Sequence, residues 1–177
     1  MTSWTTADIP PQTGRTVVVT GGTSGLGLET ARALAAAGAR VVLAVRDEER
    51  GEQAAAGLPG QVEVRRLDLA DLSSVRSFAA AWDGDLDVLV DNAGLMIPPL
   101  GRTADGFELQ FGTNHLGHFA LTNLLLPHVT DRVVTLSSGL HAAGRIVLDD
   151  LNWERRTYSA TVVTKPFFDP DGEVLRS

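Results

Sequence analysis

The sequence predicts an α/β fold of the doubly wound type, in which helices cover both faces of a parallel sheet. Short apolar, β-branched runs alternate with stretches of helical spacing along most of the 177 residues. The runs are apolar on both faces, as buried parallel strands are, and the connections are long enough for right-handed crossovers. A glycine cluster directly after the first run marks a junction between a strand and a helix.

The amino-terminal elements follow from these patterns. Three consecutive valines define the first strand, and the alanine-rich helix after it carries small residues along one face, which fits close packing against a sheet. In chain order we expect a strand at Thr16–Thr20, a helix at Leu26–Ala37, a strand at Arg40–Val45, a short helix at Glu48–Ala56 and a strand at Val62–Leu67.

The later elements continue the alternation. Leu72, Val75, Ala79 and Trp82 keep helical spacing, and Asp71 precedes them as a candidate N-cap. The longest helix is expected to end at a proline, which cannot continue it. The expected elements are a helix at Leu72–Trp82, a strand at Leu86–Val90, a helix at Asp105–Leu126 ended by Pro127, and a strand at Arg132–Leu136.

Composition excludes several classes of function. A formal net charge of -7 argues against a nucleic-acid surface, and the absence of cysteine excludes disulfides, thiol nucleophiles and thiolate metal sites. The segment 1–14 is polar and lacks the apolar core of a signal peptide. The longest apolar stretch, Ala33–Val45, is broken by Gly38 and Arg40, so we expect a cytoplasmic protein without a membrane span.

The glycine cluster Thr20–Gly27 fits a phosphate-binding turn. Glycine tolerates positive φ and lets a pyrophosphate approach the main chain, while the free N–H groups of the following helix face the anion. This pattern predicts a bound dinucleotide, with an ordinary turn as the alternative.

Four motifs in register resemble the short-chain dehydrogenase/reductase family. The glycine turn, Asp68-Leu69, Asn92-Ala93-Gly94 and Leu136-Ser137-Ser138 follow successive strands in that family's order. Two further stretches, Phe107–His118 and Asp149–Trp153, are similar to its retinol-dehydrogenase-like branch, which acts on alcohols and carbonyls of apolar substrates. The resemblance covers about Ile9–Ser159 and implies a Rossmann-type sheet.

The resemblance also implies a set of cofactor-binding residues. The adenosine ribose belongs at the end of the second strand, where Arg46 would pair with the 2'-phosphate of NADP. Asp47 would instead bind the ribose hydroxyls of NAD; we favour NADP, with NAD as the alternative. The implied residues are Gly21, Thr23, Ser24, Gly25, Leu26 and Gly27 at the phosphates, Arg46, Asp68 and Leu69 around the adenosine, and Asn92, Ala93 and Gly94 near the nicotinamide ribose.

Two residues are implied to act on the substrate. Asn114, expected on an apolar helix face, would hold a water of a proton relay, or else be a core asparagine with partners. Ser138 would hydrogen-bond the substrate oxygen, or else satisfy backbone groups at a strand end together with Ser137. His115 and His118 lie three residues apart without a carboxylate cluster, so no metal site is expected. A Gly-x-Ser-x-Gly elbow is also absent from the sequence.

The family's acid/base pair, Tyr-x-x-x-Lys, is absent from the sequence. Its single tyrosine, Tyr158, precedes Lys165 by seven residues, about 10 Å of helical rise, and Pro166 disfavours a helix there. The sequence therefore resembles a family member truncated before its catalytic pair, without the last strands and helices of the fold. The fifth strand would then be an exposed sheet edge open to self-association.

These observations divide the chain into a polar segment 1–14, a dinucleotide-binding domain 15–159 and a divergent tail 160–177. The favoured function is hydride transfer between NADP(H) and a small apolar alcohol or carbonyl compound. The alternatives are a noncatalytic nucleotide-binding module and a truncated product without independent function.

Overall fold

The computed structural model describes residues 4–139 and 150–152. The chain divides into two compact units, Met1–Leu136 and Ser137–Ser177. The sheet and its helices belong to the first unit. The boundaries expected from the sequence, at residues 14/15 and 159/160, remain predictions, and the tail 160–177 lies outside the described residues.

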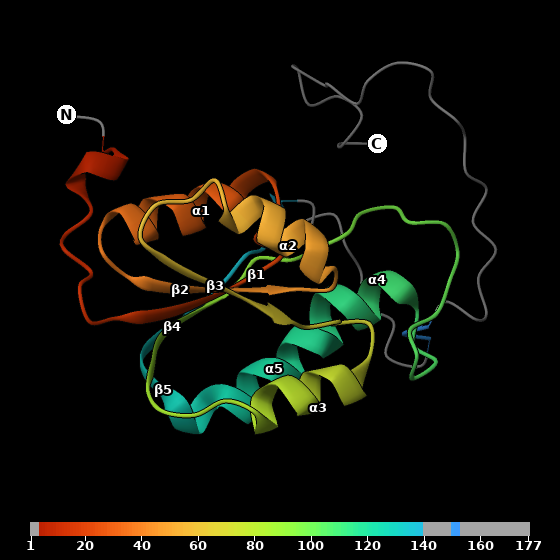
Figure 1. The fold of residues 1–177 in the computed structure, drawn as a ribbon. Helices are drawn as coiled ribbons and strands as arrows, with labels where there is room; N and C mark the ends of the chain where they lie inside the picture. Colours follow the sequence, from red (N-terminus) through yellow and green to blue (C-terminus); the bar gives the residue numbers. More distant parts are fainter. Residues whose placement is uncertain (1–3, 140–149, 153–177) are drawn as a thin grey trace, which may run out of the picture. The chain divides into compact units, whose positions relative to one another are not determined.

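A parallel sheet of five strands forms the centre of the first unit, in the order β3-β2-β1-β4-β5 (Figure 1). β1 lies between β2 and β4, with Thr16 opposite Arg40 and Val17 opposite Val88. This arrangement confirms the predicted fold class. The strands are β1 (Thr16–Thr20), β2 (Arg40–Val45), β3 (Gln61–Arg66), β4 (Leu86–Asp91) and β5 (Val129–Thr135).

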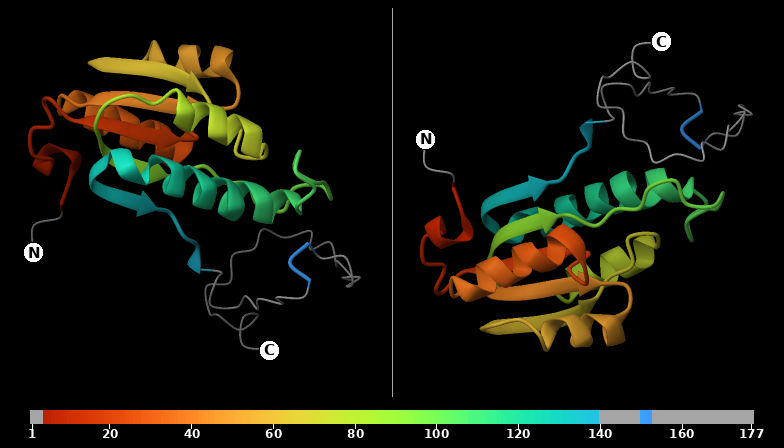
Figure 2. Two further views of the ribbon diagram at one scale, coloured as in Figure 1. Left: turned by 90° about the horizontal axis from the view of Figure 1, so that it is seen from below. Right: turned by 90° about the horizontal axis from the view of Figure 1, so that it is seen from above.

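Helices cover both faces of the sheet, as Figures 1 and 2 show. Helices α1 (Gly25–Ala36) and α2 (Glu48–Ala55) lie on one face, and α3 (Leu72–Ala80) and α5 (His118–Leu125) lie on the other. Successive strand residues point to opposite faces, so β1 contributes to two cores. Val17 and Val19 pack on the α1 side, whereas Val18 belongs to the core on the α3 and α5 side.

Side-chain caps begin two of these helices. Asp71 accepts hydrogen bonds from the backbone N–H groups of Ser73 (2.8 Å) and Ser74 (3.3 Å), which confirms it as the N-cap of α3. Asp47 caps α2 in the same way, accepting from the N–H of Arg50 at 3.1 Å. These caps satisfy backbone donors that a helix leaves without partners in its first turn.

The helical segment before β5 differs most from the prediction. Instead of one helix over 105–126, the chain forms α4, a π-helical turn η2, α5 and a 3-10 turn η3. The carboxylate of Glu108 accepts from the N–H groups of Gln110 (2.9 Å) and Phe111 (2.7 Å), so the helix begins after this cap. The bounds are α4 (Leu109–Phe111), η2 (Gly112–Gly117) and η3 (Leu126–His128), and a 3-10 turn η1 (Thr6–Asp8) lies near the amino terminus.

β5 is an edge strand of the described sheet, because it pairs only with β4 among residues 4–139. It begins at Val129, three residues before the predicted start, where it pairs with Leu86. Val134 on this strand is 41% exposed. Self-association through this edge remains a prediction. In the part of the chain that the structure describes, none of the helices has the length and hydropathy needed to cross a membrane.

Candidate functional site

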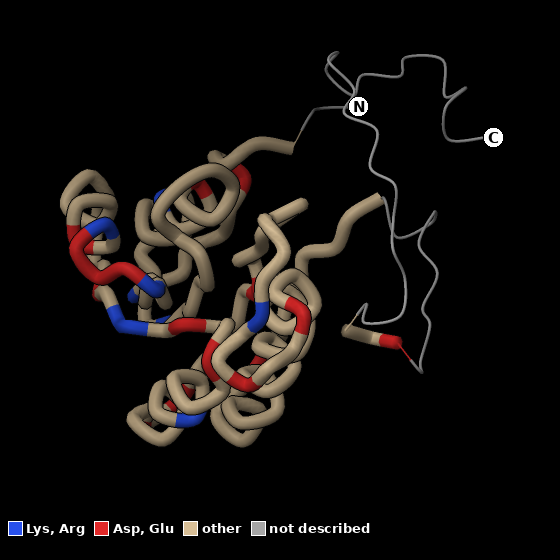
Figure 3. Tube along the Cα trace, turned by 90° about the vertical axis from the view of Figure 1, so that its right-hand side faces the viewer, with Lys and Arg blue, Asp and Glu red and all other residues tan. Residues whose placement is uncertain are grey.

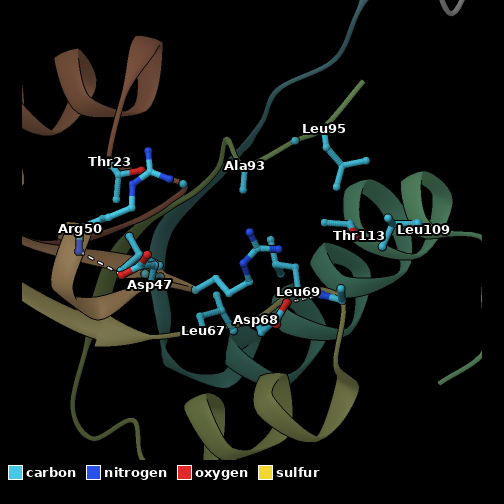
Figure 4. A pocket seen from close by; sticks show the side chains of 16 residues that line it. Thr23, Asp47, Arg50, Leu67, Asp68, Leu69, Ala93, Leu95, Leu109 and Thr113 are labelled. Atoms are coloured by element: carbon cyan, nitrogen blue, oxygen red, sulfur yellow. Dashed lines mark hydrogen bonds between the residues drawn. The ribbon is translucent and has the colours of Figure 1, made fainter. Parts of the chain in front are cut away.

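A pocket of about 280 Å³ lies at the carboxyl ends of the strands (Figure 4). Strand order reverses between β1 and β4, the position where open parallel sheets bind ligands. The predicted residues in the lining are Gly21, Thr23, Arg46, Asp68, Leu69, Ala93 and Gly94, and the others are Ala44, Val45, Asp47, Arg50, Leu67, Ala70, Leu95, Leu109 and Thr113.

The turn between β1 and α1 has the geometry of an anion cradle. Gly21 (φ 68°) and Gly25 (φ 56°) occupy the left-handed region, which favours glycine. Ser24 stands at the N-cap of α1, yet its side chain makes no capping hydrogen bond. The first N–H groups of this twelve-residue helix therefore have no side-chain cap and can face an anion.

The β1 turn packs tightly against the turn after β4. A Cβ atom on Gly27 would lie 2.4 Å from Nδ2 of Asn92 and 2.7 Å from the carbonyl oxygen of Gly21. Asn92 donates from Nδ2 to the carbonyl oxygen of Thr20 at 2.8 Å. The two turns can therefore approach because Gly27 has no side chain, and the hydrogen bond from Asn92 connects them. Gly21 and Ala93, one from each turn, line the pocket.

A buried threonine joins the same two turns. The hydroxyl oxygen of Thr20 accepts hydrogen bonds from the N–H groups of Asn92 and Ala93, each at 2.9 Å. Its proton has two acceptors within reach, Nε2 of His118 at 2.9 Å and the carbonyl oxygen of Val90 at 3.4 Å. The shorter distance favours His118, so Nε2 accepts and Nδ1 carries the ring proton.

This assignment extends the network to the π-helical turn. Nδ1 of His118 lies 3.0 Å from the carbonyl oxygen of Asn114 and donates to it. His118 is itself buried on α5. A chain of hydrogen bonds therefore runs from the turn after β4, through Thr20 and His118, to the backbone of Asn114. No local sequence pattern indicates this role of His118, because its partner Thr20 is 98 residues away.

The side chain of Asn114 holds the loop after β4. Its Oδ1 accepts from the N–H of Leu95 at 2.9 Å, and its Nδ2 donates to the carbonyl oxygen of Leu95 at 2.7 Å. The expectation of an apolar helix face was wrong, since Asn114 is exposed while Leu121 and Leu125 are buried. The π-helical turn explains the difference, because its wider spacing breaks the 3.6-residue period between these positions.

The turn after β3 is held by Asp68. Its Oδ1 accepts from the N–H of Ala70 at 3.0 Å, and its own N–H donates to the hydroxyl of Ser74 at 2.9 Å. Leu69 is buried in the core on the α3 side and also lines the pocket. Both residues therefore have a structural role as well as a place in the pocket wall.

Asp91, at the end of β4, is the centre of a second polar cluster. Its Oδ2 accepts from the hydroxyls of Thr122 (2.9 Å) and Thr135 (3.2 Å), whereas Oδ1 is buried and has no hydrogen-bond partner in the part of the chain that the structure describes. Burial raises the pKa of this carboxyl group above its ordinary value of 3.8, although His118 and the two hydroxyls partly oppose the rise. No pattern in the sequence singles out this buried carboxyl group.

Several predicted residues lie outside the pocket lining. Ser24 and Leu26 flank Gly25 at the start of α1, where Leu26 is largely exposed. Ser138 belongs to the second unit and follows the last residue of β5 by three positions, so its contact with substrate remains a prediction. Tyr158 and Lys165 lie outside the described residues. Within residues 4–139 and 150–152, no cluster of three His, Asp or Glu side chains could hold a metal ion.

The pocket contains two features that the sequence analysis missed. Arg50, on the first turn of α2, lines it together with Arg46, and no local pattern in the sequence indicates this position, because it depends on the packing of α2 against the sheet. Thr113, in η2, also lines it, and its hydroxyl is buried and has no hydrogen-bond partner within residues 4–139 and 150–152. This hydroxyl group is available to form a hydrogen bond with a polar ligand in the pocket.

Comparisons with known proteins agree with this geometry. A family model described as short chain dehydrogenase matches residues 15–148. Retinol dehydrogenase 13 of Homo sapiens is 48% identical over 158 residues, which represent 82% of this chain and 48% of the relative. The chain thus spans about half the length of the curated relatives it matches.

Two solved structures extend the comparison. An uncharacterized protein from Mycobacterium paratuberculosis shares 63% sequence identity with a TM-score of 0.86, and the match covers 89% of this chain and 59% of that one. The Pseudomonas aeruginosa RhlG/NADP active-site complex shares 32% identity with a TM-score of 0.58, covering 68% of this chain and 51% of that one.

Proposed function

This chain belongs to the short-chain dehydrogenase family, and from that premise we propose that it binds NADP(H) and transfers hydride to or from a small apolar alcohol or carbonyl compound. The observation that carries the proposal is the pocket at the point where strand order reverses, built from the turns after β1, β2, β3 and β4.

The glycine turn supports the binding of a dinucleotide. Left-handed Gly21 and Gly25 shape a turn that leads into an N-terminus of α1 without a side-chain cap, and such a terminus attracts a pyrophosphate. The adenosine part would lie against Asp68 and Leu69, and the nicotinamide ribose near Ala93 and Gly94. A bound nicotinamide supplies the hydride or accepts it.

The first turn of α2 supports NADP over NAD. Asp47, the residue that would bind the ribose hydroxyls of NAD, directs its carboxylate to the N–H of Arg50 as a helix cap. Arg46 lines the pocket, and an arginine fork matches the oxygen geometry of a phosphate. The RhlG complex named above contains NADP, which agrees with this assignment.

Asn114 and Ser138 are proposed to act at the reacting end of the cofactor. The backbone carbonyl of Asn114 is fixed by His118, and its side chain fixes Leu95 in the pocket wall. We assign Asn114 to hold a water of the proton relay, and Ser138 to donate a hydrogen bond to the substrate oxygen. An apolar substrate accords with the similarity to retinol dehydrogenase 13.

A second candidate function is binding of the nucleotide without turnover. The single tyrosine of the sequence, Tyr158, lies seven residues before Lys165, and this spacing differs from that of the family's acid/base pair. The pocket and the glycine turn would serve either function.

Oxidation of NADPH by the purified chain tests the two candidates. We expect loss of reduced-nicotinamide absorbance in the presence of medium-chain aldehydes and aromatic ketones, and none with Gly25→Trp, which fills the open space beside the cradle. Ser138→Ala should slow turnover by about 100-fold while the Kd for NADPH stays unchanged. Binding of NADPH without oxidation of any carbonyl compound would instead favour the second candidate.

A further inference from the structure

We infer that His118 is a positioning residue for the nicotinamide end of the pocket. It takes the proton of the Thr20 hydroxyl and thereby leaves both lone pairs of that oxygen to the turn after β4. His118 does not line the pocket itself. The inference rests on the proposed function and extends it to a buried residue of α5, which would act on the cofactor site through Thr20 and Ala93.

The hydroxyl group of Thr20 uses its full bonding capacity. A hydroxyl group offers one proton and two lone pairs. The N–H groups of Asn92 and Ala93, each at 2.9 Å, occupy the lone pairs, and the proton is directed to Nε2 of His118 at 2.9 Å. Thr20 is fully buried, so bulk water does not compete for these bonds. The position of Ala93, which lines the pocket, therefore depends on where the proton of Thr20 goes.

A second acceptor for this proton is less favourable. The carbonyl oxygen of Val90 lies 3.4 Å from the hydroxyl oxygen of Thr20, and it already accepts the N–H of Asn92 at 3.1 Å. A shorter bond to Val90 would require movement of Thr20 or of the end of β4, and both hold the pocket wall. Loss of the His118 ring should therefore loosen the turn 92–94 while the rest of the fold persists.

The backbone around α5 fixes the ring in place. Gly117, directly before His118, packs against the turn after β3, where a Cβ atom on Gly117 would lie 2.4 Å from the carbonyl oxygen of Leu69. The other ring nitrogen of His118, Nδ1, donates to the carbonyl oxygen of Asn114 at 3.0 Å. Because the imidazole is ordered before any ligand binds, its ordering does not reduce the affinity for the cofactor.

Hydrogen bonds rather than an ion pair connect His118 to the pocket. The helical segment 109–126 contains no Asp, Glu, Lys or Arg, and its tube in Figure 3 carries neither colour of a charged residue. The carboxyl group of Asp91, on β4, interacts electrostatically with His118, but its Oδ2 accepts hydrogen bonds from Thr122 and Thr135. The effect of His118 on the pocket should therefore follow the hydrogen-bonding groups of its side chain.

Amide substitutions separate the two sides of the ring. In His118→Gln the side-chain oxygen can replace Nε2 and accept from Thr20, whereas in His118→Asn the shorter amide can replace Nδ1 and donate to the carbonyl oxygen of Asn114. His118→Leu loses both bonds. In titration calorimetry, His118→Leu and His118→Asn should weaken NADPH about 3- to 10-fold, and His118→Gln should stay within about twofold of wild type.

Adenosine 2',5'-bisphosphate distinguishes positioning from a general loss of structure, because it lacks the nicotinamide and the ribose attached to it. Its Kd should change less than about twofold in all three variants. Parallel losses for both ligands in His118→Leu, unchanged NADPH affinity in His118→Asn, or rescue by Asn instead of Gln would overturn the inference.

His128→Leu is the matched control. The ring of His128 also meets a carbonyl oxygen, that of Gly84 at 3.1 Å, but His128 lies in η3 and outside the pocket lining. Both affinities should remain at their wild-type values in this variant. A selective loss of NADPH affinity in His128→Leu would overturn the assignment of the effect to His118.

Two measurements test the link without a ligand. Nitrogen-15 spectra of the wild-type chain should show the ring proton of His118 on Nδ1, and a proton on Nε2 would overturn the inference without any variant. Hydrogen exchange at the N–H of Ala93 should be about tenfold faster in His118→Leu than in His118→Gln, and equal rates would overturn it as well. A wild-type chain that meets both expectations but binds no NADPH would overturn the proposed function and support the link from His118 to Ala93.

Discussion

The hydroxyl group of Thr20, at the end of β1, lies 2.9 Å from Nε2 of His118 on α5. Both side chains are buried, with exposed fractions of 0% and 6%. The same hydroxyl accepts the N–H groups of Asn92 and Ala93, so one side chain links the central strand, the turn after β4 and the helix that follows. The pocket wall at Ala93 therefore depends on a residue that does not line the pocket.

Thr20→Val removes this link without changing the shape of the side chain. The N–H of Ala93 loses its acceptor, the N–H of Asn92 keeps only the carbonyl oxygen of Val90 at 3.1 Å, and His118 loses its donor. We expect a loss of about 2–4 kcal/mol in the free energy of unfolding, measured by urea denaturation. Thr20→Ser keeps the hydroxyl and should lose about 1 kcal/mol for the missing methyl group. Equal losses in the two variants would contradict the role of the hydroxyl.

Gly27→Ala tests the close approach of the two turns. The added Cβ would lie 2.4 Å from Nδ2 of Asn92, so the turns must separate. We expect a destabilisation of about 1–3 kcal/mol and at least ~10-fold weaker binding of NADPH, measured by calorimetry. Gly57→Ala is the control, because its Cβ would meet only the carbonyl oxygen of Ala54 at 3.7 Å. Unchanged NADPH affinity in Gly27→Ala would refute this account of the cradle.

Asp91→Asn should change the pH dependence of stability. Burial raises the pKa of Asp91 in the folded chain, so the unfolded chain ionises at lower pH. In the wild type, the contribution of Asp91 to the free energy of unfolding is fully present below pH 3.8, the ordinary pKa of the group. This contribution is lost as the pH rises through the raised pKa of Asp91 in the folded chain. The variant lacks this decline. Its stability relative to wild type should therefore increase from acid to neutral pH, to a difference on the order of 1 kcal/mol.

Asp131→Asn provides a control of opposite sign. Arg15 and then Arg132 hold the pKa of Asp131 below 3.8, so its contribution is present above that pH and is lost as the pH falls through the folded pKa. The variant should be less stable than wild type at neutral pH and equal to it in acid. Unfolding curves collected between acid and neutral pH check both variants, and parallel pH profiles for the two would disprove the assignment for Asp91.

Asn114→Ala should release the loop after β4. The N–H of Leu95 loses its acceptor, and we expect its hydrogen exchange to accelerate about tenfold. Gln110→Ala is the matched control, because Oε1 of Gln110 accepts from the N–H of Ile97 at 2.8 Å in the same loop. Asn114→Ala should accelerate hydrogen exchange at Leu95 more than at Ile97, and Gln110→Ala should accelerate it more at Ile97 than at Leu95. Unchanged protection of the Leu95 amide in Asn114→Ala would contradict the proposal that the side chain of Asn114 holds this loop.

The sequence was sufficient for the strands and for the glycine turn. Three consecutive valines in β1 and the positive φ angles of Gly21 and Gly25 are local properties, and local patterns report them directly. The π-helical turn depends instead on hydrogen bonds one residue longer than those of an α-helix, which no residue period announces. For that reason the environment of Asn114 was predicted wrongly.

Residues whose role depends on distant partners could not be identified either. His118 meets Thr20 only after the sheet and α5 have packed together. Arg50 reaches the pocket because Gly51 allows α2 to approach Val45 and Val64, a contact between separate elements. Asp47 and Arg46 remained alternatives in the sequence, and the use of Asp47 as a helix cap supports the role proposed for Arg46.

Calorimetric titration of the purified chain with NADPH and with NADH tests the central claim most directly. Arg46, which lines the pocket beside a cradle with left-handed glycines, predicts that NADPH binds at least ~10-fold more tightly than NADH, because a charge-assisted contact contributes about 1.5–3 kcal/mol. Equal affinities, tighter binding of NADH, or no binding of either dinucleotide would contradict it.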